Sequence, residues 1–175
     1  MTRCDLRVGV IGLGALGLPM AANLRRADVP LRVHTRSRWA ERDPSLQGSI
    51  ACATPAEVAQ GVDVLLVCVS DNAAVEAVLF GANGASNQLA AGSVVVDCST
   101  IAPATAITSA KRLAQRGVHY LDAPVTGGTE GAKAGSLTVL VGGKPAALEH
   151  ARPVLEIIGG SIHHFGPVGR GQQVK

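Results

Sequence analysis

Residues 6–24 read LRVGVIGLGALGLPMAANL and decide the fold. The apolar run at 6–11 has the length and branched content of a buried strand, and residues 20–24 have the composition of a helix. Between them lies Gly12-x-Gly14-x-x-Gly17. In a strand–glycine–helix context, Gly12 permits the tight turn, Gly14 lets the backbone approach a pyrophosphate, and Gly17 lets the helix pack closely on the strand. The stretch therefore predicts a dinucleotide-binding turn at a helix N-terminus.

Composition favours a parallel sheet covered by helices. The 175 residues suffice for one domain with a core, and they are 47% hydrophobic but only 2% aromatic. Such an aliphatic core suits parallel strands buried on both faces. The net charge of +3 is too small to indicate nucleic-acid binding, and no apolar stretch reaches the length of a membrane span. No signal peptide is evident, and the four cysteines form no C-x-x-C pair. We therefore expect reduced, buried thiols in a cytoplasmic protein without a metal site.

Strand-like and helix-like segments alternate along the rest of the chain. Strands are expected at 31–34, within 50–60, and at 62–69, 93–97, 118–121, 137–141 and 161–165. Helices are expected within 50–60 and at 73–79, 103–116 and 145–158. This alternation predicts an α/β fold with a doubly wound, mostly parallel sheet and helices on both faces.

The residues after the second predicted strand indicate which cofactor is bound. An acidic residue about twenty positions past the glycines would bind a ribose 2′-hydroxyl and favour NAD. Here the chain has Thr35, Arg36, Ser37 and Arg38. Hydroxyls and guanidiniums suit a 2′-phosphate, so the segment predicts NADP rather than NAD. The alternative is a solvated basic loop.

A second glycine-containing segment, Thr126-Gly127-Gly128, follows the strand predicted at 118–121. In a loop at the same sheet edge as the first turn, its exposed N–H groups would suit a carboxylate. From local sequence alone, an ordinary turn is the more economical interpretation.

Four stretches carry a resemblance to a known family: GLGALGLPMAANL (12–24), DCSTI (97–101), DAPVTGGTEGAKAGSLTVLVGG (122–143) and GRGQQVK (169–175). In this order and spacing they resemble the β-hydroxyacid dehydrogenase family, which includes 3-hydroxyisobutyrate dehydrogenases and semialdehyde reductases. The resemblance extends over essentially the whole chain.

The resemblance implies a Rossmann-type NADP-binding domain at 1–165, with 166–175 beginning a linker helix to a second, all-helical domain absent from this chain. It also assigns roles to individual residues. Arg36 would lie near the adenosine ribose, beside Thr35 and Ser37 of the same polar run; Val69 and Ser70 would lie along the cofactor, and Thr100 near the nicotinamide. Thr126, Gly127 and Gly128 would bind the substrate carboxylate, although the family usually has serine at position 126. Lys175 would be the catalytic acid/base. The cofactor pyrophosphate would lie along Gly12, Leu13, Gly14, Ala15, Leu16 and Gly17.

The implied reaction is hydride transfer between NADP and a short 3-hydroxyacid or semialdehyde, in a longer parent protein that forms homo-oligomers. The 175 residues alone are expected to bind NADP but to turn over little, because Lys175 ends the chain. A solvated terminal lysine is the alternative interpretation of that residue. A non-catalytic NADP-binding or interaction module is the alternative function. Continuation of the reading frame past Lys175 into helical sequence would separate the two.

Overall fold

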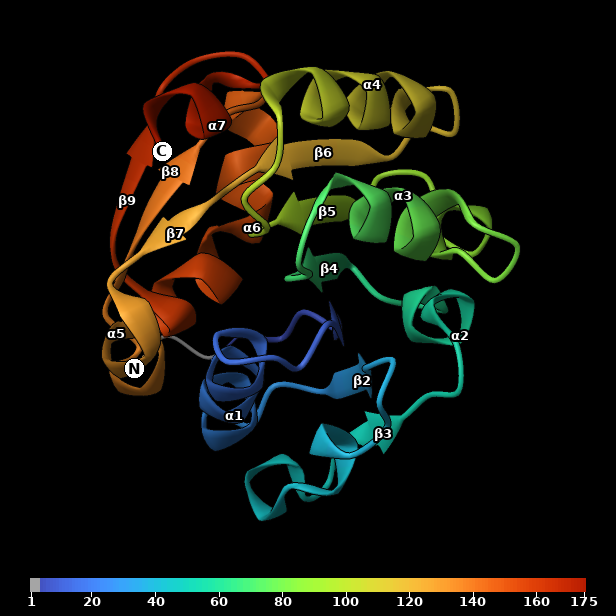
Figure 1. The fold of residues 1–175 in the computed structure, drawn as a ribbon, viewed down its shortest axis with the longest axis vertical. Helices are drawn as coiled ribbons and strands as arrows, with labels where there is room; N and C mark the ends of the chain where they lie inside the picture. Colours follow the sequence, from blue (N-terminus) through green and yellow to red (C-terminus); the bar gives the residue numbers. More distant parts are fainter. Residues whose placement is uncertain (1–3) are drawn as a thin grey trace.

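The main element of the fold is a six-stranded, fully parallel sheet. The computed structural model describes residues 4–175 (Figure 1). The strand order is β3-β2-β1-β4-β5-β6, and every neighbouring pair is parallel. The strands are β1 (Val8–Ile11), β2 (Leu31–His34), β3 (Ile50–Ala51), β4 (Val64–Val67), β5 (Val94–Asp97) and β6 (His119–Asp122). The predicted doubly wound sheet is confirmed.

Helices cover both faces of this sheet. Helices α1 and α6 pack on one face, and α2, α3 and α4 on the other (Figure 1). The helices are α1 (Gly17–Arg26), α2 (Pro55–Ala59), α3 (Asn72–Phe80), α4 (Pro103–Ala114), α5 (Gly128–Ala134), α6 (Pro145–Ile158) and α7 (Arg170–Val174). Three 3-10 segments are η1 (Ala40–Arg42), η2 (Pro44–Leu46) and η3 (Ala85–Asn87). Within residues 4–175, none of the helices combines the length and apolarity needed to cross a membrane.

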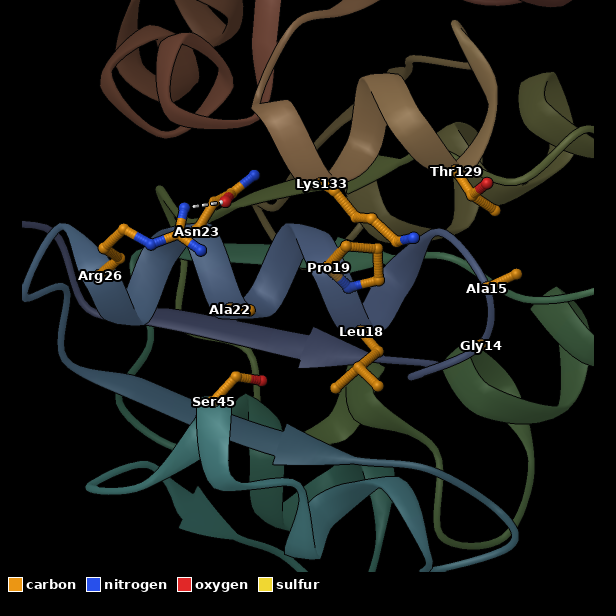
Figure 2. A pocket seen from close by; sticks show the side chains of 10 residues that line it. All are labelled: Gly14, Ala15, Leu18, Pro19, Ala22, Asn23, Arg26, Ser45, Thr129 and Lys133. Atoms are coloured by element: carbon orange, nitrogen blue, oxygen red, sulfur yellow. Dashed lines mark hydrogen bonds between the residues drawn. The ribbon is translucent and has the colours of Figure 1, made fainter.

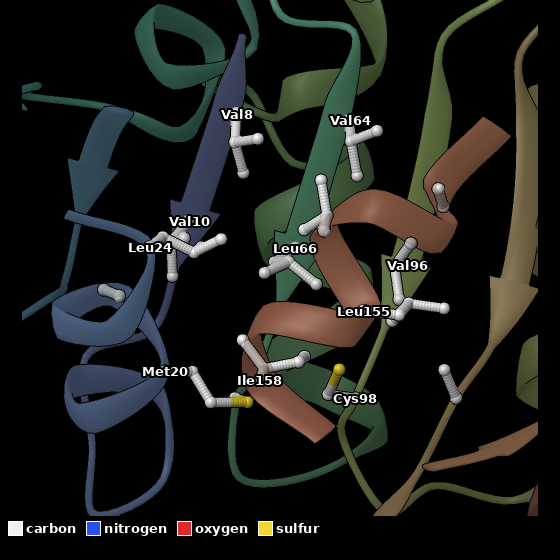
Figure 3. Close-up of a cluster of buried hydrophobic side chains, with 14 of the residues drawn as sticks. Val8, Val10, Met20, Leu24, Val64, Leu66, Val96, Cys98, Leu155 and Ile158 are labelled. Atoms are coloured by element: carbon white, nitrogen blue, oxygen red, sulfur yellow. The ribbon is translucent and has the colours of Figure 1, made fainter. Parts of the chain in front are cut away.

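Alternation along the strands builds two aliphatic layers. Val10 and Leu66 face α1 and α6, where they pack with Met20 and Leu155 (Figure 3). Leu65, one position along β4, joins the opposite cluster. Because each layer is buried, every strand of the sheet centre is apolar on both sides.

A second, three-stranded sheet was not predicted. It contains β7 (Val125–Thr126), β8 (Leu137–Val141) and β9 (Gly159–His164), with β7 antiparallel to β8 and β8 parallel to β9. The Ala123 N–H makes a bond to the Asp97 carbonyl at 2.8 Å. Pro124 follows and has no N–H, so the main ladder ends there and the chain turns into the smaller sheet.

The segment Thr126–Gly128 was predicted as a loop, and this is wrong in detail. Thr126 ends β7, and Gly128 begins α5. Helix α5 was missed because Gly128, Gly131 and Gly135 make its sequence resemble a flexible turn.

Candidate functional site

The turn between β1 and α1 has the geometry that its glycines predicted. Gly12 has a φ of +95°, and a Cβ there would overlap the Cys68 carbonyl and lie 3.0 Å from Val69 Cγ1. A Cβ on Gly17 would overlap the Gly12 carbonyl. At Gly14, by contrast, a Cβ would meet nothing within 4 Å. Two glycines therefore allow close packing, while the third faces open space.

The carboxyl ends of β1, β4 and β5 meet at one edge of the sheet. The Cys68 N–H donates to the Ile11 carbonyl at 2.9 Å, and the Val69 N–H donates to Ser99 Oγ at 3.0 Å. Ser70 and Thr100, the next residues out, are both exposed. The glycine turn, Val69–Ser70 and Thr100 are thus brought together, although they lie up to 88 positions apart in the sequence, from Gly12 to Thr100 (100 − 12).

The segment after β2 is also at this edge. Arg36 and Ser37 are exposed and Thr35 is half-buried. Arg38, which the sequence analysis also placed toward a 2′-phosphate, pairs with Glu41 through its Nε at 2.7 Å. Glu41 was not anticipated, because it lies outside the run of polar residues that follows the strand.

Beneath the edge, a buried carboxylate shapes the turn after β5. Asp97 is fully buried and accepts hydrogen bonds from the Ser99 N–H at 3.0 Å and the Tyr120 hydroxyl at 2.8 Å. Burial raises the pKa of Asp97 to about 6, although the bonds from Ser99 and Tyr120 act in the opposite direction. Because the Ser99 hydroxyl accepts the Val69 N–H, Asp97 also helps to hold the ends of β4 and β5 together beneath the site.

This raised pKa makes a testable contribution to stability. The folded protein holds the Asp97 proton more tightly than the unfolded chain does, so this contribution is lost as pH rises from about 4 to about 6 and stays lost above. We expect the unfolding free energy of wild type, relative to that of Asp97→Asn, to fall by about 2–3 kcal/mol over that window. Urea denaturation of both proteins at pH 4, 5, 6 and 7 measures the difference. Parallel stability curves would contradict the assignment.

Helix α7, which ends at Val174 directly before Lys175, is held to the same region. The buried Asp122 carboxylate accepts hydrogen bonds from the Gly169 N–H at 2.7 Å and the Gln172 N–H at 2.8 Å. The Gln172 side chain donates to the Ser99 carbonyl at 2.7 Å and accepts from the Ile101 N–H at 3.1 Å. These two bonds flank Thr100, while Lys175 is exposed three residues beyond Gln172. Sequence reasoning missed Asp122 and Gln172, whose partners are backbone groups from distant segments.

A groove of about 410 Å³ runs over the outer face of α1, between α5 and η2 (Figure 2). It reaches the predicted site at Gly14 and Ala15, and Thr129, directly after Gly128, lines the same groove. The structure therefore places the start of α5 beside the glycine turn. The groove is lined by Gly14, Ala15, Leu18, Pro19, Ala22, Asn23, Arg26, Ser45, Thr129 and Lys133.

The cysteines lie in the core, as expected from their apolar surroundings. All four are free; Cys4, Cys52 and Cys98 are buried and Cys68 is half-buried. Burial raises the pKa of Cys68 to about 12, which keeps this thiol protonated. Across residues 4–175, no group of three or more His, Cys, Asp or Glu side chains is arranged to hold a metal ion.

Comparison with known proteins agrees with this geometry. The family described as the NAD binding domain of 6-phosphogluconate dehydrogenase matches residues 7–166. The 2-hydroxy-3-oxopropionate reductase of Escherichia coli is 39% identical over 97% of this chain and 58% of its own length. The solved structure of Mycobacterium tuberculosis 3-hydroxyisobutyrate dehydrogenase with L-serine superposes with a TM-score of 0.91 at 30% identity, covering 98% of this chain and 58% of that one. Psf3 in complex with NADP+ and 2-OPP gives 0.90 at 36% identity, covering 95% and 59%.

The chain thus spans a little under three fifths of the length of these proteins. The match over residues 7–166 includes the glycine turn, the segment after β2 and the carboxyl ends of β4 and β5. The chain belongs to the family of NAD-binding domains of the 6-phosphogluconate dehydrogenase type.

Proposed function

We propose that this chain is the NADP-binding part of a dehydrogenase or reductase that acts on a short 3-hydroxyacid or semialdehyde. The observation that carries the proposal is the glycine turn, where Gly12 and Gly17 pack tightly and Gly14 faces open space. The 2-hydroxy-3-oxopropionate reductase and the 3-hydroxyisobutyrate dehydrogenase described above support the substrate class.

In this proposal different residues at the sheet edge bind different parts of the cofactor. The backbone of residues 12–17 holds the pyrophosphate, where the N-terminus of α1 favours negative charge. Thr35, Arg36 and Ser37 hold a 2′-phosphate, which only NADP carries. Val69 and Ser70 lie along the cofactor, and Thr100 lies near the nicotinamide.

The proposed chemistry needs a hydride and a proton. The nicotinamide cofactor supplies or accepts the hydride when bound. Thr126, Gly127 and Gly128 bind the substrate carboxylate through hydroxyl and N–H groups. In reduction, the Lys175 ammonium polarises the substrate carbonyl and delivers a proton to its oxygen; in oxidation, the neutral amine takes the hydroxyl proton. The tie between Gln172 and the backbone on both sides of Thr100 supports this arrangement.

We further propose a cytoplasmic location and a homo-oligomeric full-length parent. Four free thiols are typical of a reducing compartment. Ile107, Phe165 and Val174 are large apolar side chains left exposed on α4, after β9 and on α7. An apolar surface of this kind is consistent with further protein contacts in a longer chain.

The NADP assignment predicts a selective effect of Arg36→Asp. A carboxylate in place of the guanidinium removes a charge-assisted bond and repels the 2′-phosphate. We expect NADPH affinity to fall about 10- to 100-fold and NADH affinity to change less than about threefold. Calorimetric titration of the purified chain measures both affinities, and quenching of the exposed Trp39 provides a second signal.

Arg116→Asp is the matched control for charge. Arg116 follows α4 and lies at the amino edge of the sheet, opposite the proposed site. Its neighbour Gly117 accepts a hydrogen bond from the Gly92 N–H, just before β5 begins. This variant should leave both affinities unchanged. Equal loss of NADPH and NADH binding in Arg36→Asp would overturn the NADP assignment.

A further inference from the structure

A buried carboxylate lies beneath the exposed basic segment that follows β2. The Glu41 side chain is only 3% exposed, although it belongs to the surface segment η1. Its Oε1 accepts the Thr35 N–H at 2.9 Å, and its Oε2 accepts Arg38 Nε at 2.7 Å. His34 Nδ1 lies 3.7 Å from Oε1 and 3.0 Å from the Cys52 carbonyl. A carboxylate is buried in this way only when it is hydrogen-bonded, so the bonds to the Thr35 N–H and Arg38 Nε are required to keep Glu41 buried.

The groups that Glu41 binds are the two ends of one tight turn. The Arg38 N–H donates to the Thr35 carbonyl at 3.1 Å and closes a four-residue turn. Arg38 has a φ of +61°, in the left-handed region that side-chain-bearing residues rarely adopt. A conformation of this kind persists only where its surroundings hold it. The two hydrogen bonds accepted by Glu41 hold the turn in this conformation.

The middle of the turn is formed by Arg36 and Ser37, which are both exposed. Glu41 compensates the charge of Arg38 but makes no bond to Arg36 in the contacts described. Across the sheet edge, the Ala74 N–H and the Ser70 hydroxyl lower the pKa of Asp71, with a smaller contribution from the positive charge of Arg36. Arg36 therefore lies within electrostatic range of Asp71, which follows β4 at the same edge of the sheet.

We propose that Glu41 is a positioning residue that sets the cofactor preference. It fixes the turn at 35–38 so that Arg36 and Ser37 are presented to a ribose 2′-phosphate before binding. This inference rests on the proposed binding of NADP. If the turn were loose, its ordering would oppose binding of the 2′-phosphate, whereas a cofactor without that phosphate would be little affected. The expected signature of Glu41 is therefore a change in the ratio of NADPH to NADH affinity.

Titration of three variants of the full 175-residue chain with NADPH and NADH tests this role. We expect Glu41→Ala to weaken NADPH about tenfold and NADH less than twofold. Glu41→Gln keeps an oxygen acceptor for the Thr35 N–H but offers no acceptor to Arg38 Nε, so it should weaken NADPH by an intermediate factor of about threefold and leave NADH unchanged. Glu57→Ala is the matched control, because Glu57 also accepts a backbone N–H, from Ala53 at 2.9 Å, but under a different turn. It should leave the affinity ratio unchanged.

Each outcome decides between defined alternatives. An unchanged ratio in Glu41→Ala overturns the inference, and tighter NADPH binding does so as well, since it would mean that Glu41 acts by restraining the charge of Arg38. If Glu41→Ala does not fold, Glu41→Asp replaces it with the same expectations, because its shorter side chain does not span both ends of the turn. If wild type shows no preference for NADPH and Arg36→Asp does not alter the ratio, the NADP assignment itself fails. If Arg36→Asp alters the ratio and Glu41→Ala does not, only the role of Glu41 fails.

Discussion

Replacing Gly12 by alanine is expected to destabilise the protein by about 2–6 kcal/mol and to abolish nucleotide binding. The φ of +95° strains any side-chain-bearing residue, which costs about 1–3 kcal/mol. The new Cβ would also overlap the Cys68 carbonyl, and forcing an extra group into a packed interior costs a further 1–3 kcal/mol or so. The Cys68 N–H donates a hydrogen bond to the Ile11 carbonyl at the end of β1. If the Cys68 backbone moved away to relieve the overlap, this bond between β1 and the end of β4 would therefore be strained or lost. Urea denaturation and NADPH titration measure the two effects.

Gly14→Ala is the informative companion to this variant. A Cβ at Gly14 meets no protein atom within 4 Å, and Gly14 is not among the residues with positive φ. Its stability should therefore equal that of wild type or exceed it by up to about 1 kcal/mol. Its NADPH affinity should nevertheless fall at least about tenfold, because the methyl group occupies the space proposed for the pyrophosphate. Normal NADPH binding by Gly14→Ala would show that the cofactor does not pass this residue.

The first strand, the glycine turn and the first helix could be predicted from local sequence, whereas the second sheet could not. The β1–glycine–α1 unit is specified within some twenty consecutive residues, and the aliphatic runs of β4 and β5 are recognisable by composition alone. The second sheet is not recognisable in this way. Its first strand has two residues, and its pairing partner in β8 lies beyond a glycine-rich helix. Short strands are defined by tertiary pairing, which local periodicity does not encode.

The same distinction applies to the site. Exposed polar residues at strand ends could be proposed from sequence: Arg36 from the polar run after the second strand, and Ser70 and Thr100 through the family resemblance. The buried carboxylates Asp97 and Asp122 could not. Each is the last residue of a strand, and each binds groups that the fold brings together; the partners of Asp122 lie 47 and 50 residues away. A sequence pattern gives the residue type but does not show which backbone N–H groups face it.

Replacing Asp122 by alanine is expected to release α7 from the domain. The substitution leaves the buried Gly169 and Gln172 N–H groups without their acceptor, and each unsatisfied group costs about 1–3 kcal/mol. Detachment of this short helix exposes far less buried surface than global unfolding does, so it requires less energy. We expect hydrogen-exchange protection of the Gln172 and Ile101 amides to fall at least about 100-fold, while the amides of β5 change much less. Amide exchange followed by NMR measures each site separately.

Two adjacent glutamines separate the contributions of backbone and side chain. Gln172 is buried and bridges Ser99 and Ile101, whereas Gln173 is exposed and accepts only from Arg170 in the contacts described, at 2.8 Å. Gln172→Ala should expose the Ile101 amide but keep its own N–H protected by Asp122, and Gln173→Ala should alter neither. If Asp122→Ala leaves Ile101 protected, the side-chain bridge alone holds α7 in place. Loss of protection at both amides would instead identify Asp122 as the group that holds α7, the helix directly before Lys175, against the turn that carries Thr100.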